Sequence, residues 1–404
     1  MTERVPVGTV PGERLYSLSF LGAHLAFMPI FALLLPRRIA VIAPEQAIET
    51  LSSLLLIGGI VASVAHIAAG RWSDRWLVKF GSRRGLIGLG LIALCAAQVG
   101  LAVAQTWTAL VIAIIIFQVA LNLMFAPLGA LLADYISDER KGRVAGLLNA
   151  ALPLSSMGTA VAAFLFPRDG PGGFLLVAIA SGLAILPLLI AWPFGAGAKP
   201  RKPNDVAAIP PSREARRDYL KIWCARLLIQ LGAAFVINYF YLYLIDLGGN
   251  GGQASRRIGS FAMVATAASF ASAIGSGFWS DRVGRRKPPL MLASLAATSG
   301  LLVLALEPSP LMVLAAYVIF HVGLTAFLSV DSALVAQLLA QSRRRGELLG
   351  LMNLTNTLPA IIVPAIAIRA ASGAAPLNWP LAFVMAATLA LGALALISRI
   401  RTIA

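Results

Sequence analysis

The chain has 404 residues, of which 59% are hydrophobic and only 12% are charged, and its mean hydropathy is +0.83. Soluble domains carry about 25% charged residues, so this composition excludes a soluble globular protein. The net charge of +16 does not indicate a nucleic-acid partner, because the cations are confined to short connections between apolar segments. Cys95 and Cys224 both lie within apolar segments, so neither a disulfide framework nor a metal site is expected.

Apolar segments of about 20 residues recur along the chain, and each is long enough to cross a hydrocarbon core of about 30 Å as a helix. They show no period-2 alternation, so helices are expected rather than the strands of a barrel. The fold class predicted is an all-α membrane protein with twelve transmembrane helices. The predicted spans are Tyr16–Leu35, Ile48–Ala69, Gly85–Ala104, Thr108–Ala133, Val144–Phe166, Gly173–Phe194, Asp218–Ile245, Ile258–Trp279, Pro289–Leu306, Leu311–Leu339, Leu348–Ala371 and Pro380–Ile397.

One motif occurs twice, each time in the connection after an apolar segment. Trp72-Ser73-Asp74-Arg75 returns 207 positions later as Trp279-Ser280-Asp281-Arg282. A glycine precedes each copy and a basic cluster follows it, with about four extra residues near Trp76–Phe80 in the first copy. The clusters are Gly81-Ser82-Arg83-Arg84 and Gly284-Arg285-Arg286-Lys287. A repeat of half the chain length indicates a duplicated membrane bundle.

The chain is therefore expected to contain two six-helix bundles with pseudo-symmetry. The expected divisions are an N-tail at 1–15, bundles at 16–196 and 218–398, a central Pro-rich and charged loop at 197–217, and a C-tail at 399–404.

Charge asymmetry predicts the orientation of these bundles. Alternate connections hold 26 of the 33 Lys and Arg residues, whereas the opposite side holds six. The positive-inside rule then places both termini and both copies of the motif in the cytoplasm. Because the N-tail lacks the features of a signal peptide, the first helix is expected to act as the insertion signal.

Twelve helices in two halves, with G-x-x-x-D-R…G-R-R after helices 2 and 8, resemble the major facilitator superfamily. Smaller features resemble its glycoside–pentoside–hexuronide and sucrose-type carriers: Asp134–Gly142, Val330–Leu334, and Gly350-Leu351-Met352-Asn353 with Asn356 and Pro359.

The resemblance implies alternating access around a cavity lined by helices 1, 4, 7 and 10. It also implies gating roles for Gly70, Asp74, Arg75, Gly277, Asp281, Arg282, Arg285 and Arg286. The two aspartates would lie near the positive N-termini of helices 11 and 5. For the arginines the alternative is that they only determine topology.

The chain also departs from some branches of that family. Helix 4 has no intramembrane arginine, and helix 5 lacks the Gly-Pro-rich signature of drug antiporters, which disfavours efflux by antiport. Helix 2 has no carboxylate and helix 4 has none before Asp134, so the paired acids that bind sodium in the sugar symporters are missing. Sodium coupling is not expected.

Four ionisable residues within spans are candidates for proton coupling or substrate contact, because a charge at the bilayer centre is costly. Of the 17 acids, only Asp331 lies well inside a helix, and Arg226 lies at nearly the same depth, about 12 Å. We therefore predict that these two pair, with a structural bridge as the alternative. His24 and His321 lie on cavity-type helices, although a lone histidine more often packs within a core. His66 is expected only to pack.

Neutral polar residues are expected to line the cavity: Gln118, Asn122, Gln230, Asn238, Tyr239, Asn353 and Asn356. Such a lining suits a hydroxylated or moderately polar solute. Asn353 and Asn356 should share one helix face, and the alternative for them is a bond between helices. For Tyr241 and Tyr243, an interfacial aromatic belt is the better interpretation.

No nucleotide-binding loop, metal cluster or catalytic triad can be assembled, so neither enzyme activity nor a cofactor or metal is expected. The predicted function is secondary active transport of a small organic solute, such as a sugar or glycoside, with protons as the coupling ion. The expected partners are this solute, protons and the lipid bilayer of the cell membrane, with the chain acting as a monomeric symporter. The alternatives are an efflux carrier or a transporter-like assembly factor or sensor.

Overall fold

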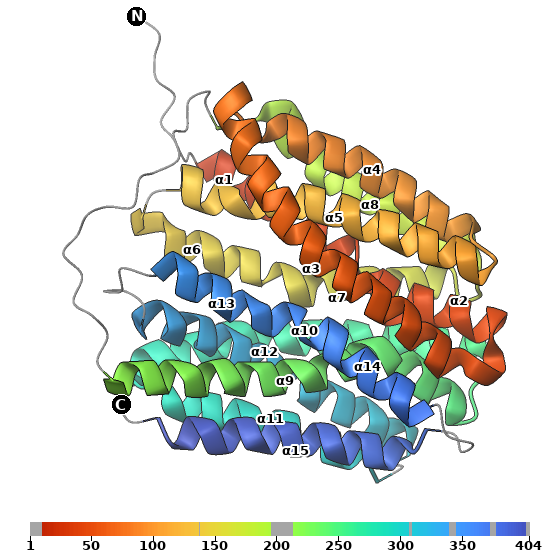
Figure 1. The fold of residues 1–404 in the computed structure, drawn as a ribbon. Coiled ribbons are helices and arrows are strands. Elements are labelled where there is room, and N and C mark those ends of the chain that lie inside the picture. The colour runs from red at the N-terminus through yellow and green to blue at the C-terminus, as the bar shows by residue number, and fades with distance from the viewer. Residues whose placement is uncertain are drawn as a thin grey trace, which may run out of the picture. The chain divides into compact units, whose positions relative to one another are not determined.

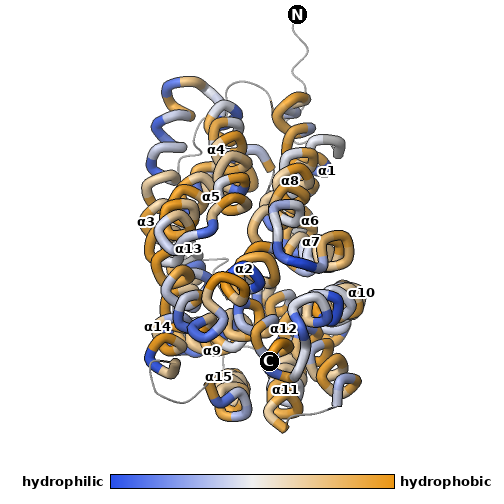
Figure 2. Tube along the Cα trace, turned by 90° about the vertical axis from the view of Figure 1, so that its right-hand side faces the viewer, coloured by the Kyte–Doolittle hydropathy of each residue, from blue (hydrophilic) through white to orange (hydrophobic). Residues whose placement is uncertain are grey.

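The computed structural model describes residues 10–136, 138–194, 213–306, 309–338, 345–371 and 377–400. Twelve helical segments among them are long and apolar enough to cross a membrane, which confirms the predicted fold class. Figure 2 shows mainly hydrophobic residues in most of the helices and hydrophilic residues at several helix ends. The N-tail before residue 10, most of the central loop and residues 401–404 lie outside the described residues.

The chain divides into two compact units (Figure 1). The first comprises Met1–Asn204 with Gly249–Gly259. Its helices are α1 (Val10–Leu25), the π-helix η1 (Ile30–Leu34), α2 (Leu35–Ile42), the short 3-10 helix η2 (Pro44–Gln46), α3 (Ala47–Phe80), α4 (Arg84–Val103), α5 (Trp107–Tyr135), α6 (Asp138–Asn149), α7 (Ala151–Leu165) and α8 (Pro171–Ala191). Within this unit α5 packs against α3 and α4, while α8 packs against α1 and α4.

The second unit comprises Asp205–Gly248 and Ser260–Ala404. Its helices are α9 (Arg213–Asp246), α10 (Gly251–Val283, which begins in the first unit), α11 (Lys287–Leu304), α12 (Pro310–Leu338), α13 (Arg345–Thr357), α14 (Pro359–Ala371) and α15 (Trp379–Ser398). Helix α11 packs against α12 and α15, and α15 also packs against α9.

Three predicted spans are interrupted close to a proline. The first breaks after α1 and resumes as a π-helix directly after Pro29. The fifth breaks between α6 and α7, three residues before Pro153, and the eleventh resumes as α14 at Pro359. In the first break, Gln98 Nε2 donates to the carbonyl of Ala26 at 3.0 Å. A side chain of a neighbouring helix thus satisfies backbone that the interruption leaves irregular, as a membrane bundle requires.

The repeated motif is helical, whereas the sequence predicted a loop there. Helix α3 continues through Trp72 to Phe80, and α10 continues to Val283. No proline or glycine interrupts the chain between the first motif and Gly81, so the helix has no reason to end earlier. Gly81 then ends α3 with φ 70°, and Gly284 follows α10 with φ 67°. Only glycine adopts this left-handed conformation at little cost, which explains its place at both helix ends.

Tyr241 and Tyr243 lie in the interior of the second unit, so the interfacial belt predicted for them is wrong. Their exposed fractions are 0% and 1%. The Tyr243 hydroxyl donates to the carbonyl of Leu304 at 3.5 Å, and its ring lies 4.9 Å from that of Phe383. Helices α15 and α12 pack against α9, and this packing is not encoded in the local sequence around the tyrosines.

Arg38 ties together three parts of the first unit. Its Nε lies 2.7 Å from Asp169 Oδ2, and its side chain is only 5% exposed. Its Nη1 donates to the carbonyls of Ala102 and Ala104 at 3.3 and 2.8 Å. The guanidinium also lies 5.3 Å from the ring centroid of Phe174. Arg38 therefore joins α2 to the end of α4 and to the connection before α8.

Replacing Arg38 by Met should lower the free energy of unfolding by about 3 kcal/mol, because removing one partner of a buried ion pair strands the other. Thermal unfolding of the detergent-solubilised protein measures the change. Arg168→Met is the matched control, since Arg168 is an exposed cation on the same connection as Asp169. Equal and small effects of the two substitutions would contradict a clamping role for Arg38.

Candidate functional site

Arg226 of α9 and Asp331 of α12 form a buried ion pair in the second unit. Arg226 Nη1 lies 2.7 Å from Asp331 Oδ2, and the two side chains are 15% and 1% exposed. Their equal depth in the sequence predicted this contact, and the contact is confirmed. The pair is charge-assisted and short, as expected where the surroundings have a low dielectric constant.

Amide side chains extend the pair onto α13. Asn356 Oδ1 accepts hydrogen bonds from Gln230 Nε2 at 2.7 Å and from Arg226 Nη2 at 3.4 Å. Asn356 Nδ2 donates to Asn353 Oδ1 at 2.9 Å, which confirms that the two asparagines share a helix face. Both asparagines are exposed, whereas the carboxylate beside them is buried. Three helices of one unit thus bring a carboxylate, a guanidinium and three amides together.

Two buried atoms of the ion pair have no hydrogen-bond partner within the described part of the chain. They are Asp331 Oδ1 and Arg226 Nε. Buried polar atoms are nearly always paired, and an unpaired one costs about 1–3 kcal/mol. The carboxylate oxygen is therefore able to receive a proton, and the guanidinium N–H is able to donate to an added acceptor. The arrangement can exchange a proton or hold an anionic group.

The other candidates of the second unit lie outside this network. His321 packs its ring 4.2 Å from that of Tyr317 and 5.3 Å from that of Phe320. Tyr239 is fully buried, and its ring lies 5.7 Å from that of Phe235. Asn238 is half-buried on the same helix. The histidine and the tyrosine thus have the surroundings of packing residues.

In the first unit, the structure joins Asn122 to a histidine that was expected only to pack. His66 Nδ1 donates to Asn122 Oδ1 at 3.0 Å, and Asn122 Nδ2 donates to the carbonyl of Gln118 at 2.9 Å. Because α3 continues to Phe80, His66 lies 14 residues, or about 21 Å, from the helix end rather than near it. His66 is therefore a site candidate that the predicted helix boundary concealed.

His24 lies within an aromatic cluster on α1 and α5. Its Nδ1 donates to the carbonyl of Phe20 at 2.8 Å. The rings of Phe20, Phe27 and Phe125 lie 5.1, 5.4 and 5.5 Å from its own. This geometry fits the alternative that His24 packs within the core, because its hydrogen bond runs to a residue of its own helix.

Arg83 is the centre of the first copy of the motif. Its Nε lies 2.7 Å from Asp134 Oδ2, and its Nη2 lies 2.8 Å from Asp74 Oδ1. A third hydrogen bond runs from Nη1 to the hydroxyl of Ser73. The arginine side chain is 5% exposed, as against 11% for Asp134 and 73% for Asp74. Arg83 therefore locks the end of α3 to the end of α5.

Burial alone would lower the pKa of the Arg83 guanidinium, but the hydrogen bonds and charges of Asp134 and Asp74 outweigh it and raise the pKa above its ordinary value. A cation with a raised pKa contributes stability below its unfolded pKa and loses it only as the pH rises through the folded value. That window lies above the ordinary pKa of arginine, so Arg83 stays charged in any working buffer.

The second copy reproduces part of this arrangement. Arg286 corresponds to Arg83 at an offset of 203, and its Nη1 donates to the hydroxyl of Ser280 at 2.9 Å. The side chain of Asp281 lies outside the described residues. The remaining gating candidates lie within or just beyond the two extended helices: Gly70, Arg75, Gly277, Arg282 and Arg285, of which the three arginines are exposed. The predicted proximity of Asp74 and Asp281 to helices 11 and 5 stays a prediction.

Arg83 and Asp134 were missing from the predicted gating residues. A signal for Arg83 was present, because the basic clusters align at an offset of 203, which pairs it with Arg286. Nothing local in the sequence indicated that Asp134, at the end of a different helix, would reach it.

The sequence matches the Major Facilitator Superfamily over residues 16–276 and 222–402. The chain therefore belongs to this superfamily: it is a multi-pass membrane transporter of a small solute and not an enzyme. No curated protein matches it significantly by sequence.

Solved structures share its fold at low sequence identity. A POT family transporter in complex with 5-aminolevulinic acid matches with a TM-score of 0.76 and 14% identity, covering 97% of each chain. A POT family transporter in complex with a thioalcohol-conjugated peptide matches with a TM-score of 0.76 and 13% identity, covering 96% of this chain and 95% of the other. A bacterial homologue of the human lysosomal transporter Spinster, inward-facing and unoccupied, matches with a TM-score of 0.59 and 16% identity, covering 97% and 95%.

Asp134→Asn should slow transport more than Asp74→Asn does, because Asp134 is the buried partner of Arg83 and its loss leaves a buried cation with one exposed partner. Solute affinity should stay within a few fold, since both residues lie at helix ends of the first unit, whereas the amide network is built by helices of the second. Initial transport rates and equilibrium binding in proteoliposomes separate the two effects. A loss of binding with an unchanged rate of conformational exchange would count against a gating role.

Neutralising either Arg226 or Asp331 alone should harm transport more than neutralising both, because a single change strands a charge in a low-dielectric interior. Arg226→Gln, Asp331→Asn and the double variant can be compared by solute counterflow, with surface expression as the control. A double variant no more active than the worse single variant would refute energetic coupling within the pair.

Proposed function

We propose that this protein is a proton-coupled secondary transporter of a small organic solute, and that the Arg226–Asp331 pair is its coupling site. The observation that carries the proposal is a buried carboxylate with one oxygen on a guanidinium and the other without a partner among the described residues. Protonation of that oxygen would weaken the pair and free Arg226. Deprotonation would restore the pair.

Alternating access provides the cycle into which this switch fits. In such a cycle the substrate and coupling sites lie near the bilayer midplane between two helical bundles that rock against each other. The contacts of Arg83 with Asp134, and the corresponding contact of Arg286 with Ser280, would serve as parts of the gate. Since the basic connections predict a cytoplasmic face, we propose a cell-membrane location with both termini in the cytoplasm.

The solute proposed is a hydroxylated compound such as a sugar or glycoside. Gln230, Asn353 and Asn356 present amides that pair with hydroxyl groups, and the two asparagines are exposed beside the buried pair. The features that resemble glycoside–pentoside–hexuronide and sucrose-type carriers support this class.

A second candidate solute class carries a carboxylate. Arg226 has an unpaired Nε and is 15% exposed, so an acidic group could reach it. A transporter of the same fold binds 5-aminolevulinic acid.

Counterflow with neutral glycosides, hexuronates and amino acids would distinguish the two classes. Absence of flux with all of these solutes would favour an assembly factor or sensor. Flux driven only outward would favour an efflux carrier.

Asp331→Asn should abolish accumulation driven by a proton gradient but reduce counterflow only in part, because an amide cannot exchange a proton and strands Arg226 but leaves the solute contacts in place. Proteoliposomes with an imposed pH gradient measure accumulation, and preloaded vesicles measure counterflow. Asn353→Asp tests specificity, since it places a carboxylate at an exposed neighbouring position. Proton-driven accumulation that survives Asp331→Asn would show that coupling resides elsewhere.

A further inference from the structure

The end of α3 carries an extra helical turn that neither the gate nor the coupling site uses. The two motifs are 207 positions apart, but α3 and α10 end 203 positions apart, at Phe80 and Val283. The added turn extends an aromatic ladder with a spacing of four residues: Trp72, Trp76 and Phe80. The ring centroids are 6.2 Å apart for the first pair and 4.4 Å for the second. Side chains at this spacing share one helix face.

A ladder of cations lies directly beside the aromatic one. Arg71, Arg75 and Lys79 follow the same spacing, and all three are exposed. Lys79 Nζ lies 5.2 Å from the ring centroid of Phe80. Aromatic rings with adjacent basic side chains are typical of segments at the boundary between the acyl chains and the headgroups of a bilayer.

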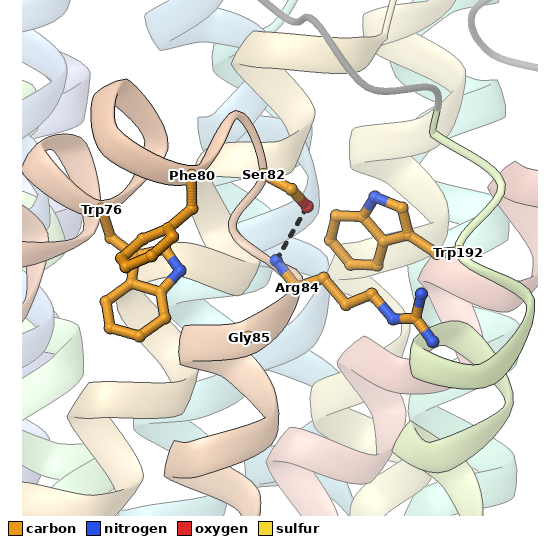
Figure 3. A pocket seen from close by; sticks show the side chains of 6 residues that line it. All are labelled: Trp76, Phe80, Ser82, Arg84, Gly85 and Trp192. Carbon is orange, nitrogen blue, oxygen red and sulfur yellow. Dashed lines mark hydrogen bonds between the residues drawn. The ribbon is translucent and has the colours of Figure 1, made fainter.

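A cavity of about 350 Å³ lies next to the aromatic ladder. Figure 3 shows its lining, in which Trp76 and Phe80 overlap and the side chain of Arg84 extends alongside Trp192. Gly85 permits this arrangement, since a Cβ atom there would approach the Trp76 ring to 3.2 Å. The cavity has the volume of a small ligand site, with three aromatic rings and one guanidinium.

Comparison of the two copies indicates that Arg84 lacks a partner that its counterpart has. Lys287 occupies the equivalent position at the start of α11, and its Nζ donates to the carbonyl of Ile400 at 3.1 Å. In the first copy the backbone N–H of Arg84 donates to Ser82 Oγ at 3.1 Å. The Arg84 guanidinium has no hydrogen-bond or ion-pair partner among the described residues and is exposed at the cavity.

Trp192, at the same edge of the cavity, carries two unfavourable features. Its φ of 29° makes it the one non-glycine residue with positive φ in the described backbone. Its indole N–H is buried without a hydrogen-bond partner in that same part of the chain. Strain and an unpaired donor each cost of order 1–3 kcal/mol, and they concentrate at sites that a ligand completes.

We propose that this cavity binds an anionic phospholipid, with its phosphate on Arg84 and its glycerol and upper acyl region against Trp76, Phe80 and Trp192. A basic pocket at the membrane surface is a recognised kind of site for such headgroups. The cavity lies between the ends of two candidate spans, one ending at Phe80 and the next beginning at Arg84, and the proposal places these ends at the membrane surface. Phe80, an apolar side chain of the lining that is 54% exposed, favours a lipid over a soluble anion.

Native mass spectrometry of the delipidated full chain, titrated with phosphatidylglycerol and in parallel with phosphatidylcholine, tests the proposal. The wild type should retain phosphatidylglycerol at lower concentration than phosphatidylcholine. Arg84→Gln should weaken phosphatidylglycerol binding by at least about fivefold, the contribution of one basic residue near an anionic surface. Trp76→Leu should also weaken it. Arg71→Gln is the matched control, since it removes the same charge from the same exposed region outside the cavity lining.

Three outcomes would overturn the proposal. Equal weakening by Arg84→Gln and Arg71→Gln would mean that diffuse surface charge, rather than a site, attracts the lipid. Full displacement of phosphatidylglycerol by inorganic phosphate in the millimolar range would identify the ligand as a soluble anion. Unchanged binding in Arg84→Gln, with the wild-type unfolding temperature, would exclude Arg84 as the phosphate ligand.

Discussion

Neutralisation of buried positive charge determines how the helices of this protein meet. The side chains of Arg38 and Arg83 are each 5% exposed and that of Arg226 is 15% exposed, and each lies 2.7 Å from a carboxylate oxygen of another element. Stranding such a cation would cost several kcal/mol, more than most single packing contacts contribute. Each pair therefore selects one alignment of its helices. Apolar surface drives burial but is not directional, whereas these contacts are.

The two copies of the motif share one backbone conformation but differ in the side chains that they contact. Both copies end a helix with a left-handed glycine and place an arginine on the serine of the motif. In the first copy Arg83 contacts Asp134 of α5, and the next cation, Arg84, lines a cavity without a side-chain partner among the described residues. In the second copy the cation after Arg286 is Lys287, which donates to the carbonyl of Ile400, just beyond the end of α15. Duplication preserved the turn, and substitution of single side chains changed what each turn contacts.

The sequence predicted the spans well because each depends on local composition and length. The predictions from sequence failed where tertiary packing determines how far a helix extends or which side chains are buried. The helical extension to Phe80 was missed because a polar motif was read as a loop, although nothing before Gly81 ends a helix. Tyr243 was assigned to an interface because its covering helices are remote in sequence. The Arg226–Asp331 contact was predictable, since two charges at one depth have few other partners. The hydrogen bonds that link Gln230 and Asn356 to this pair became apparent only in the folded structure.

The pair at Asp331 differs from the other buried pairs in a way that favours a switch over a clamp. Arg38 also donates to backbone carbonyls, which cannot titrate, so its contacts persist whatever the state of Asp169. Asp331 has a single described partner and a bare second oxygen, and Arg226 has an unpaired Nε. A buried ion pair rarely stabilises a fold more than apolar residues of equal volume would. Because both Asp331 and Arg226 keep an unpaired polar atom among the described residues, the pair contributes little to the stability of the fold. It is well suited to release, because one proton on the bare oxygen removes the charge that holds the arginine.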